Sequence, residues 1–139
     1  MSGGVYVFVY GTLRTGEAND MMRAAARHGL PAPARVGAAQ IAGRLYDFGA
    51  YPGLVLSDDG ARTCGEIYRI ADALVAVLDE IEEVYPGEAG LFVREVHDIE
   101  YEGTRYPCIV YPVAAAAVDG LLCIAGGDWV SYRRERDGR

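Results

Sequence analysis

The order of hydrophobic and polar positions along the chain predicts about six short strands. The first is a continuous run of β-branched and aromatic residues, VYVFVY at positions 5–10, which is typical of a strand buried on both faces. Others are expected at residues 41–48, 54–56, 64–70, 91–100 and 105–113. The YEGT sequence between the last two indicates an antiparallel hairpin with a glycine in its loop.

Two segments have the periodicity of helices. Residues 18–27 precede a glycine that would end a helix, and residues 72–83 form the better amphipathic pattern, with Asp72 as a plausible N-cap. The segment 114–122 is ambiguous between helix and coil. Strands that are mostly consecutive, with only two helices, favour an α+β domain on an antiparallel or mixed sheet, curled into a small barrel.

The length of 139 residues fits one domain, residues 1–139. Its last residues, 133–139, alternate arginines with acidic residues, and we expect them to be a solvated tail.

The net charge of −7 argues against nucleic acid or an anionic membrane as the partner. The sequence also shows neither a signal peptide nor an apolar run of membrane-spanning length, which favours a cytoplasmic location. Abundant alanine, glycine and arginine with no lysine suggests a GC-rich bacterial genome.

All 13 basic residues are arginine, so Schiff-base chemistry, a pyridoxal phosphate anchor and a Walker lysine are excluded. Cys64, Cys108 and Cys123 form no CxxC pair and are expected to be buried free thiols, with a nucleophile or metal ligand as the alternative. His28 and His97 lack metal-ligand spacing. We therefore expect no metal or cofactor.

One carboxylate at the end of the second helix is a candidate general base. Leu74, Val77, Leu78 and Ile81 follow the i, i+3, i+4, i+7 pattern of a buried stripe. Of the four acidic residues at this end, Glu82 is aimed most nearly towards the stripe, at roughly 60° from its centre. Partial burial there would raise its pKa towards that of a general base. The alternative, a surface carboxylate paired with an arginine such as Arg94, is slightly favoured by periodicity alone.

The turn after the first strand is a second candidate site. A glycine directly after a buried strand lets the backbone bend sharply and directs peptide N–H groups outwards. In Tyr10-Gly11-Thr12-Leu13-Arg14 such groups could hold a carboxylate or an oxyanion, although an ordinary turn would give the same pattern.

Taken together, these motifs resemble those of the γ-glutamylcyclotransferases, including the γ-glutamylamine cyclotransferase and AIG2-like branch. The match covers nearly the whole chain in the order VFVYGTLR (7–14), YPG (51–53), GEIYRI (65–70), LDEIE (78–82), Arg94, VY (110–111) and GDW (127–129).

The resemblance implies a small mixed β-barrel with flanking helices and a small-molecule γ-glutamyl substrate. Tyr10, Gly11, Thr12 and Leu13 would cradle the glutamyl group. Tyr111 could offer a hydroxyl to the cavity, although a tyrosine of the core would fit the sequence equally well. Glu82 would move a proton while the α-amine attacks the side-chain carbonyl, which releases 5-oxoproline and a free amine or amino acid.

Two alternatives remain: a non-catalytic AIG2-like binding protein of the same fold, and another amide-cleaving or acyl-transfer enzyme. The sequence also departs from the family where Phe92 replaces a common tyrosine. The loop 84–90 adds Tyr85 and Glu88, of which Glu88 could meet a cationic amine.

Overall fold

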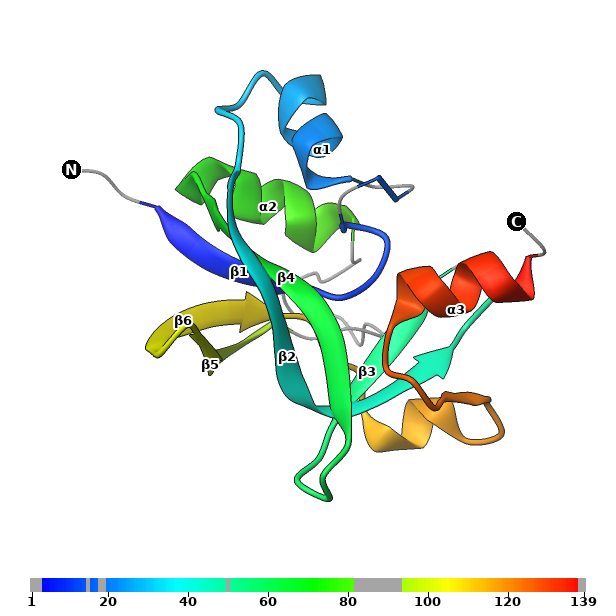
Figure 1. Cartoon of the computed structure of the whole chain (residues 1–139). Helices are drawn as coiled ribbons and strands as arrows, with labels where there is room; N and C mark the ends of the chain where they lie inside the picture. Colours follow the sequence, from blue (N-terminus) through cyan, green and yellow to red (C-terminus); the bar gives the residue numbers. More distant parts are fainter. Residues whose placement is uncertain (1–3, 15, 18–19, 50, 82–93, 138–139) are drawn as a thin grey trace.

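A computed structural model describes residues 4–14, 16–17, 20–49, 51–81 and 94–137 of the chain (Figure 1). Its elements, in order, are β1 (Val5–Val9), α1 (Met21–Arg27), β2 (Ala34–Asp47), β3 (Pro52–Leu56), β4 (Arg62–Ile70), α2 (Asp72–Ile81), β5 (Glu95–Tyr101), β6 (Thr104–Val110), the 3-10 turn η1 (Ala115–Val118), β7 (Cys123–Ile124) and α3 (Trp129–Arg136).

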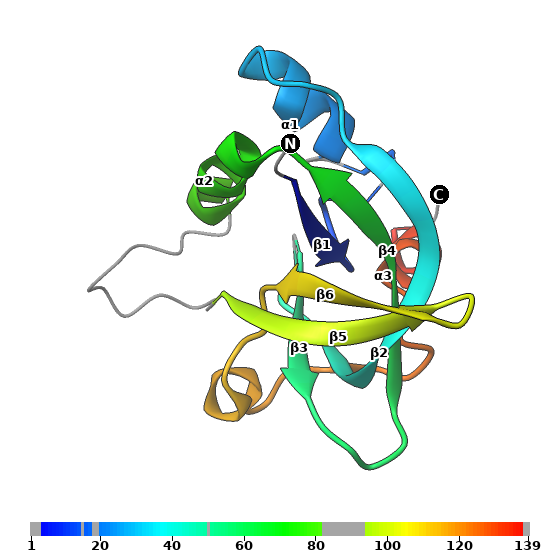
Figure 2. The same cartoon turned by 90° about the vertical axis from the view of Figure 1, so that its left-hand side faces the viewer.

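The strands form one curled sheet in the order β3-β2-β4-β1-β6-β5, with β7 beside β2. Among the described strands, the β1–β6 pairing is the parallel one, and the other pairings are antiparallel. The sheet bends into a half-barrel that stays open along one side (Figure 2). The predicted α+β fold with a mixed, mainly antiparallel β-barrel is therefore confirmed.

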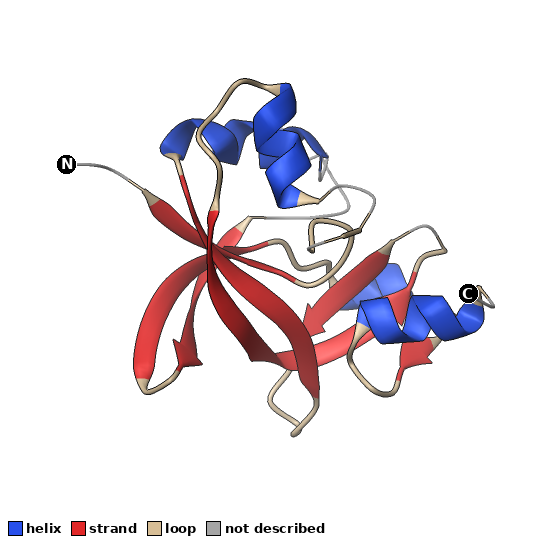
Figure 3. Ribbon diagram, turned by 45° about the horizontal axis from the view of Figure 1, so that its top comes forward, coloured by secondary structure: helices blue, strands red, loops and turns tan. Residues whose placement is uncertain are grey.

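The first strand is buried on both faces, as its composition predicts. Val7 and Val9 pack with α1 and α2, whereas Phe8 points into the concave side of the half-barrel. Each such side chain contributes about 2 kcal/mol when fully removed from water. The two helices thus cover one face of the sheet, while β3, β7 and Trp129 of α3 close the other (Figure 3).

Two glycines allow backbone segments to approach closely. A Cβ on Gly65 would collide with the carbonyl oxygen of Val9, so glycine permits β4 to pair tightly with β1. Gly127 has φ +68° and lies against the backbone of Arg62, a conformation that L side chains rarely adopt. Its carbonyl accepts the N–H of Cys64 at 2.7 Å, which fixes the start of α3 against β4.

The structure corrects the expectation for the C-terminal end of the chain. Residues 133–136 belong to α3, whose first turn is capped by the Asp128 carboxylate at 3.2 Å from the N–H of Ser131. Arg133 holds Glu17 with two hydrogen bonds of 2.8 and 2.9 Å. Because the Glu17 side chain is only 3% exposed, this pair attaches the helix firmly to the loop after β1. Arg133 therefore stabilises the tertiary structure.

A second polar cluster attaches α3 to β2. The carboxylate of Asp47 accepts the Tyr132 hydroxyl, the N–H of Gly49 at 2.6 Å and the Arg136 guanidinium at 3.1 Å. Partial burial works to raise the pKa of Asp47, but these three donors outweigh it and hold the pKa below the ordinary value. No helix in the described residues is both long and apolar enough to cross a membrane.

Replacing Asp47 by asparagine should lower the free energy of unfolding at neutral pH by about 1 kcal/mol, because a charge-assisted pair is lost. Since the folded-state pKa lies below the unfolded value, this contribution is present above pH ~4 and is lost as the pH falls through the folded-state pKa. Urea unfolding of both proteins across that range measures the difference. Asp58→Asn, at an exposed position, serves as the control and should leave the free energy of unfolding at neutral pH unchanged.

Candidate active site

The parallel pairing of β1 and β6 brings the carboxyl ends of these two strands to the same edge of the sheet. Tyr10 follows β1 and Tyr111 follows β6. The buried hydroxyl of Tyr10 donates to the carbonyl of Tyr111 at 2.6 Å and accepts the N–H of Leu54 at 3.3 Å. One phenol therefore links the ends of β1 and β6 to the middle of β3.

The turn that follows Tyr10 is held on both sides. The N–H of Arg14 donates to the carbonyl of Gly11 at 3.0 Å, which closes the turn. A Cβ on Gly11 would lie 2.7 Å from Cγ of Pro52, so only glycine fits against β3 here. Leu13 is buried with α1 and α2, and its carbonyl accepts the N–H of Met21 at 3.1 Å.

Arg14 anchors the far end of the turn. Its guanidinium donates to Glu66 at 3.2 Å and to Asp128 at 3.0 Å, and Glu66 is a buried residue of β4. The hydroxyl of Tyr68 lies 3.5 Å from the same glutamate. This network connects the YGTLR, GEIYRI and GDW motifs, which are distant in sequence, around a single cation. Sequence reasoning did not assign Arg14, Glu66 or Asp128 a role, although all three lie within its motifs.

The last turn of α2 meets this edge through Tyr111. Its hydroxyl donates to Asp79 at 2.7 Å, and Arg94 pairs with the other carboxylate oxygen of Asp79. Leu74 and Leu78 of α2 lie in the same buried cluster as Leu13 and Tyr111. The apolar stripe predicted for this helix is thus confirmed at those two leucines, and Arg94 has a partner that the sequence analysis did not choose.

The structure brings together Tyr10, Gly11, Leu13 and Tyr111 from the predicted set, with half-buried Thr12 on the turn between them. Glu82 lies outside the described residues, as do Tyr85, Glu88 and Phe92. Asp79 is the neighbour that the analysis missed; its only sequence signal was its place in the LDEIE motif.

Among the described residues, the cysteines and His97 do not converge on this edge. Burial and the nearby charge of Asp98 raise the pKa of the Cys108 thiol to about 12, so it stays protonated at neutral pH. Cys64 and Cys123 are half-buried free thiols. His97 pairs with Glu95 at 2.8 Å. Within the described ranges, no three His, Cys, Asp or Glu side chains are grouped as metal ligands.

The family model of gamma-glutamyl cyclotransferase, AIG2-like, matches residues 7–131. The chain belongs to this family. A putative gamma-glutamylcyclotransferase of Halalkalibacterium halodurans is 31% identical over 68% of the chain and 84% of its own length. The gamma-L-glutamyl-butirosin B gamma-glutamyl cyclotransferase of Niallia circulans is 33% identical over 91% of the chain and 76% of its own length.

A solved structure supports the same assignment. An AIG2-like protein from Mus musculus superposes with a TM-score of 0.72 and 25% identity, covering 87% of this chain and 86% of its own. The two proteins therefore share one fold over most of their length. Membership in the family rests on the sequence matches.

Replacing Gly11 by alanine should displace Pro52 and open the contact between the turn and β3, because the added methyl overlaps the proline ring. Overpacking of this kind costs about 1–3 kcal/mol. Thermal or urea unfolding measures the loss. Gly126→Ala is the matched control, since a Cβ there meets open space. Equal stability of the two variants would show that the turn is not held against β3 as described.

Proposed function

We propose that the protein is a γ-glutamyl cyclotransferase that converts a γ-glutamyl amide into 5-oxoproline and a free amine. The observation that carries the proposal is the fixed turn from Gly11 to Arg14. It lies where the carboxyl ends of β1 and β6 meet the last turn of α2. It is held by Pro52, by the buried Leu13 side chain and by the ion pairs of Arg14. Rigid backbone at the end of a strand suits a binding site that must orient a small, flexible substrate.

The backbone N–H groups of Gly11, Thr12 and Leu13 would bind the glutamyl head group in this proposal. Peptide N–H groups in a turn attract anionic oxygen without a charged side chain. They would also stabilise the oxyanion that forms when the γ-carbonyl is attacked. Because Arg14 is neutralised by Glu66 and Asp128, its guanidinium serves to hold the turn, and the backbone provides the donors.

Glu82 is proposed as the general acid and base. It follows Ile81, the last residue of α2, and stands three positions after Asp79 in the sequence. Asp79 is bonded to Tyr111, and three residues span at most about 11 Å of chain. The closeness of Glu82 to Asp79 in the sequence, together with the family resemblance, supports the choice of Glu82.

The reaction needs no nucleophile from the protein. Glu82 would remove a proton from the α-ammonium group, and the free amine would attack the γ-carbonyl to form a C–N bond and close a five-membered ring. Glu82 then returns this proton to the leaving nitrogen as its bond to the carbonyl carbon breaks, and the ring nitrogen releases its second proton to solvent, which gives the neutral lactam and the free amine. The chain has two tasks: to hold the folded conformer of the substrate and to transfer the proton that Glu82 carries. General acid–base catalysis of this kind typically accelerates a reaction by about 10²–10⁴-fold.

For the leaving group we propose an amine. The relative from Niallia circulans is named for γ-L-glutamyl-butirosin B, and another relative, from Bos taurus, is named a gamma-glutamylaminecyclotransferase at 29% identity. A γ-glutamyl amine, including a γ-glutamyl-protected biosynthetic intermediate, is therefore the substrate class to test first. These names do not favour the non-catalytic alternative.

Replacing Glu82 by glutamine should reduce 5-oxoproline formation by about 10³-fold with little change in stability, because the amide cannot accept the proton. Purified protein is incubated with a panel of γ-glutamyl amines and γ-glutamyl amino acids, and 5-oxoproline is measured by mass spectrometry. Glu83→Gln is the matched control and should retain the parent rate.

Two outcomes would contradict the proposal in different ways. Absence of 5-oxoproline from the whole panel would contradict the cyclotransferase activity. Full activity of Glu82→Gln would leave the reaction in place and remove Glu82 from its mechanism.

A further inference from the structure

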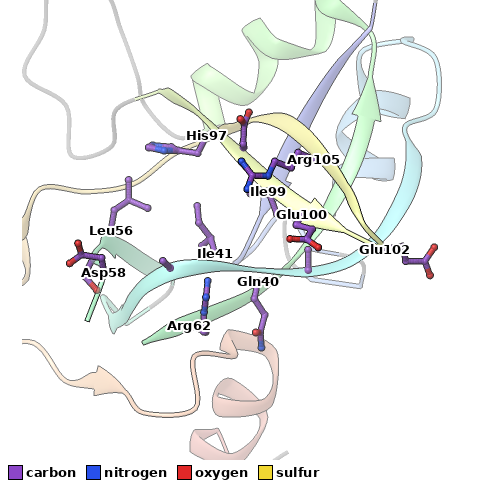
Figure 4. Close-up of a pocket in the computed structure, with 14 residues that line it drawn as sticks. Gln40, Ile41, Leu56, Asp58, Arg62, His97, Ile99, Glu100, Glu102 and Arg105 are labelled. Atoms are coloured by element: carbon purple, nitrogen blue, oxygen red, sulfur yellow. The ribbon is translucent and has the colours of Figure 1, made fainter. Parts of the chain in front are cut away.

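A separate groove of about 980 Å³ opens between β2 and β5, along the open side of the half-barrel (Figure 4). None of its lining residues belongs to the Tyr10–Arg14 turn, and Tyr111 is not among them. β3 connects the two places: Pro52 contacts Gly11 at one end, and Leu56 lines the groove at the other. The groove therefore lies about 13 Å along β3 from the proposed active site.

The groove is bordered on one side by the outer edge of β5, which has no neighbouring strand among the described residues. This strand is the last in the sheet order. Tyr101 and Thr104 flank a two-residue turn, and both residues of that turn have positive φ. In such a hairpin the flanking residues, here Tyr101 and Thr104, form a hydrogen-bonded pair, and every second pair back along the hairpin does the same. The N–H and C=O groups of Val96, Asp98 and Glu100 consequently point away from β6, towards the groove.

On its other side the groove is bordered by β2. Residues 37–42 of β2 pair with β4 through one edge, and pairing with β3 begins only at Gly43. In the described part of the chain the second edge of this stretch has no strand beside it. The two free edges meet where the ring of Tyr101 covers Gly37, and the groove opens from that contact. Exposed edges of this kind readily accept an additional strand.

The side chains that line the groove favour a ligand of a particular charge and polarity. Half-buried Leu56 and the buried side chains of Ile41 and Ile99 form the apolar part of its lining (Figure 4). Acidic side chains outnumber the arginines around it. The carboxylates are Asp58, Asp98, Glu100 and Glu102, and the arginines are Arg62 and Arg105. Within the described residues no salt bridge pairs any of the six. A cationic ligand with an apolar side therefore fits best.

We propose that this groove binds an extended, basic peptide segment of a partner protein, which adds as a strand to the free edge of β5. Alternate residues of the peptide would meet the apolar surface beside Ile99, and the others would meet Asp98 and Glu100. Main-chain hydrogen bonds give such binding its affinity, and the alternate side chains give it specificity. A second copy of this chain fits poorly, because the net charge of −7 and the acidic edge would repel each other.

The test uses the full-length protein and short labelled peptides in which valine alternates with lysine or with glutamate, with fluorescence anisotropy as the readout. We expect the lysine peptide to bind in a salt-dependent way and the glutamate peptide not to bind. Asp98→Pro should weaken binding by about tenfold, since proline removes a donor at the free edge without breaking the β5–β6 ladder. Asp98→Asn keeps that N–H, so it should weaken binding less while reducing the salt dependence.

Val96→Pro provides a second variant of the same kind, and thermal unfolding verifies that each variant is folded. Failure of the lysine peptide to bind the parent protein would overturn the proposal. Unchanged binding by folded Asp98→Pro and Val96→Pro would show that charge alone attracts the peptide, which also overturns strand addition. If the parent protein is a dimer and Asp98→Pro is a monomer, the occupant of the groove is a second copy of this chain, and the proposal of a partner protein is overturned. Each result is independent of 5-oxoproline production.

Discussion

The parallel pairing of β1 with β6 is the constraint on which the proposed active site depends. Parallel neighbours end at the same edge of a sheet, so the turn after β1 and Tyr111 after β6 become neighbours in space. The hydroxyl of Tyr10 then joins both ends to β3, and the hydroxyl of Tyr111 joins them to α2 through Asp79. Two phenols thus connect four elements around one short turn.

Two ion pairs with buried carboxylates hold the turn and the loop that follows it. Glu66 and Glu17 are both buried carboxylates, and each is compensated by an arginine: Arg14 for the first and Arg133 for the second. Removing one member of such a pair lowers stability more than replacing both members by apolar residues, because the remaining charge stays buried without a partner. Through Arg133, α3 holds Glu17 in the loop that follows the turn.

Local sequence patterns predicted the elements whose stability is local. The β1 strand, the β5–β6 hairpin and the leucine stripe of α2 follow from residue type and spacing alone. The helix α3 did not, because its composition is that of a solvated tail and its stabilising partners, Glu17 and Asp47, are far away in the sequence. The role of Arg14 escaped prediction for the same reason: its partners lie on β4 and before α3. The position of Glu82 remains a prediction, drawn from helical phase and from the family resemblance.

The central claim is that the backbone of the Gly11–Arg14 turn binds the glutamyl group. Titration of the isotopically labelled protein with 5-oxoproline, followed by amide chemical shifts, tests it most directly. The account predicts saturable shifts at the N–H groups of Gly11, Thr12 and Leu13, with much smaller shifts along β5. Shifts that spare this turn, or that centre on the groove between β2 and β5, would contradict it.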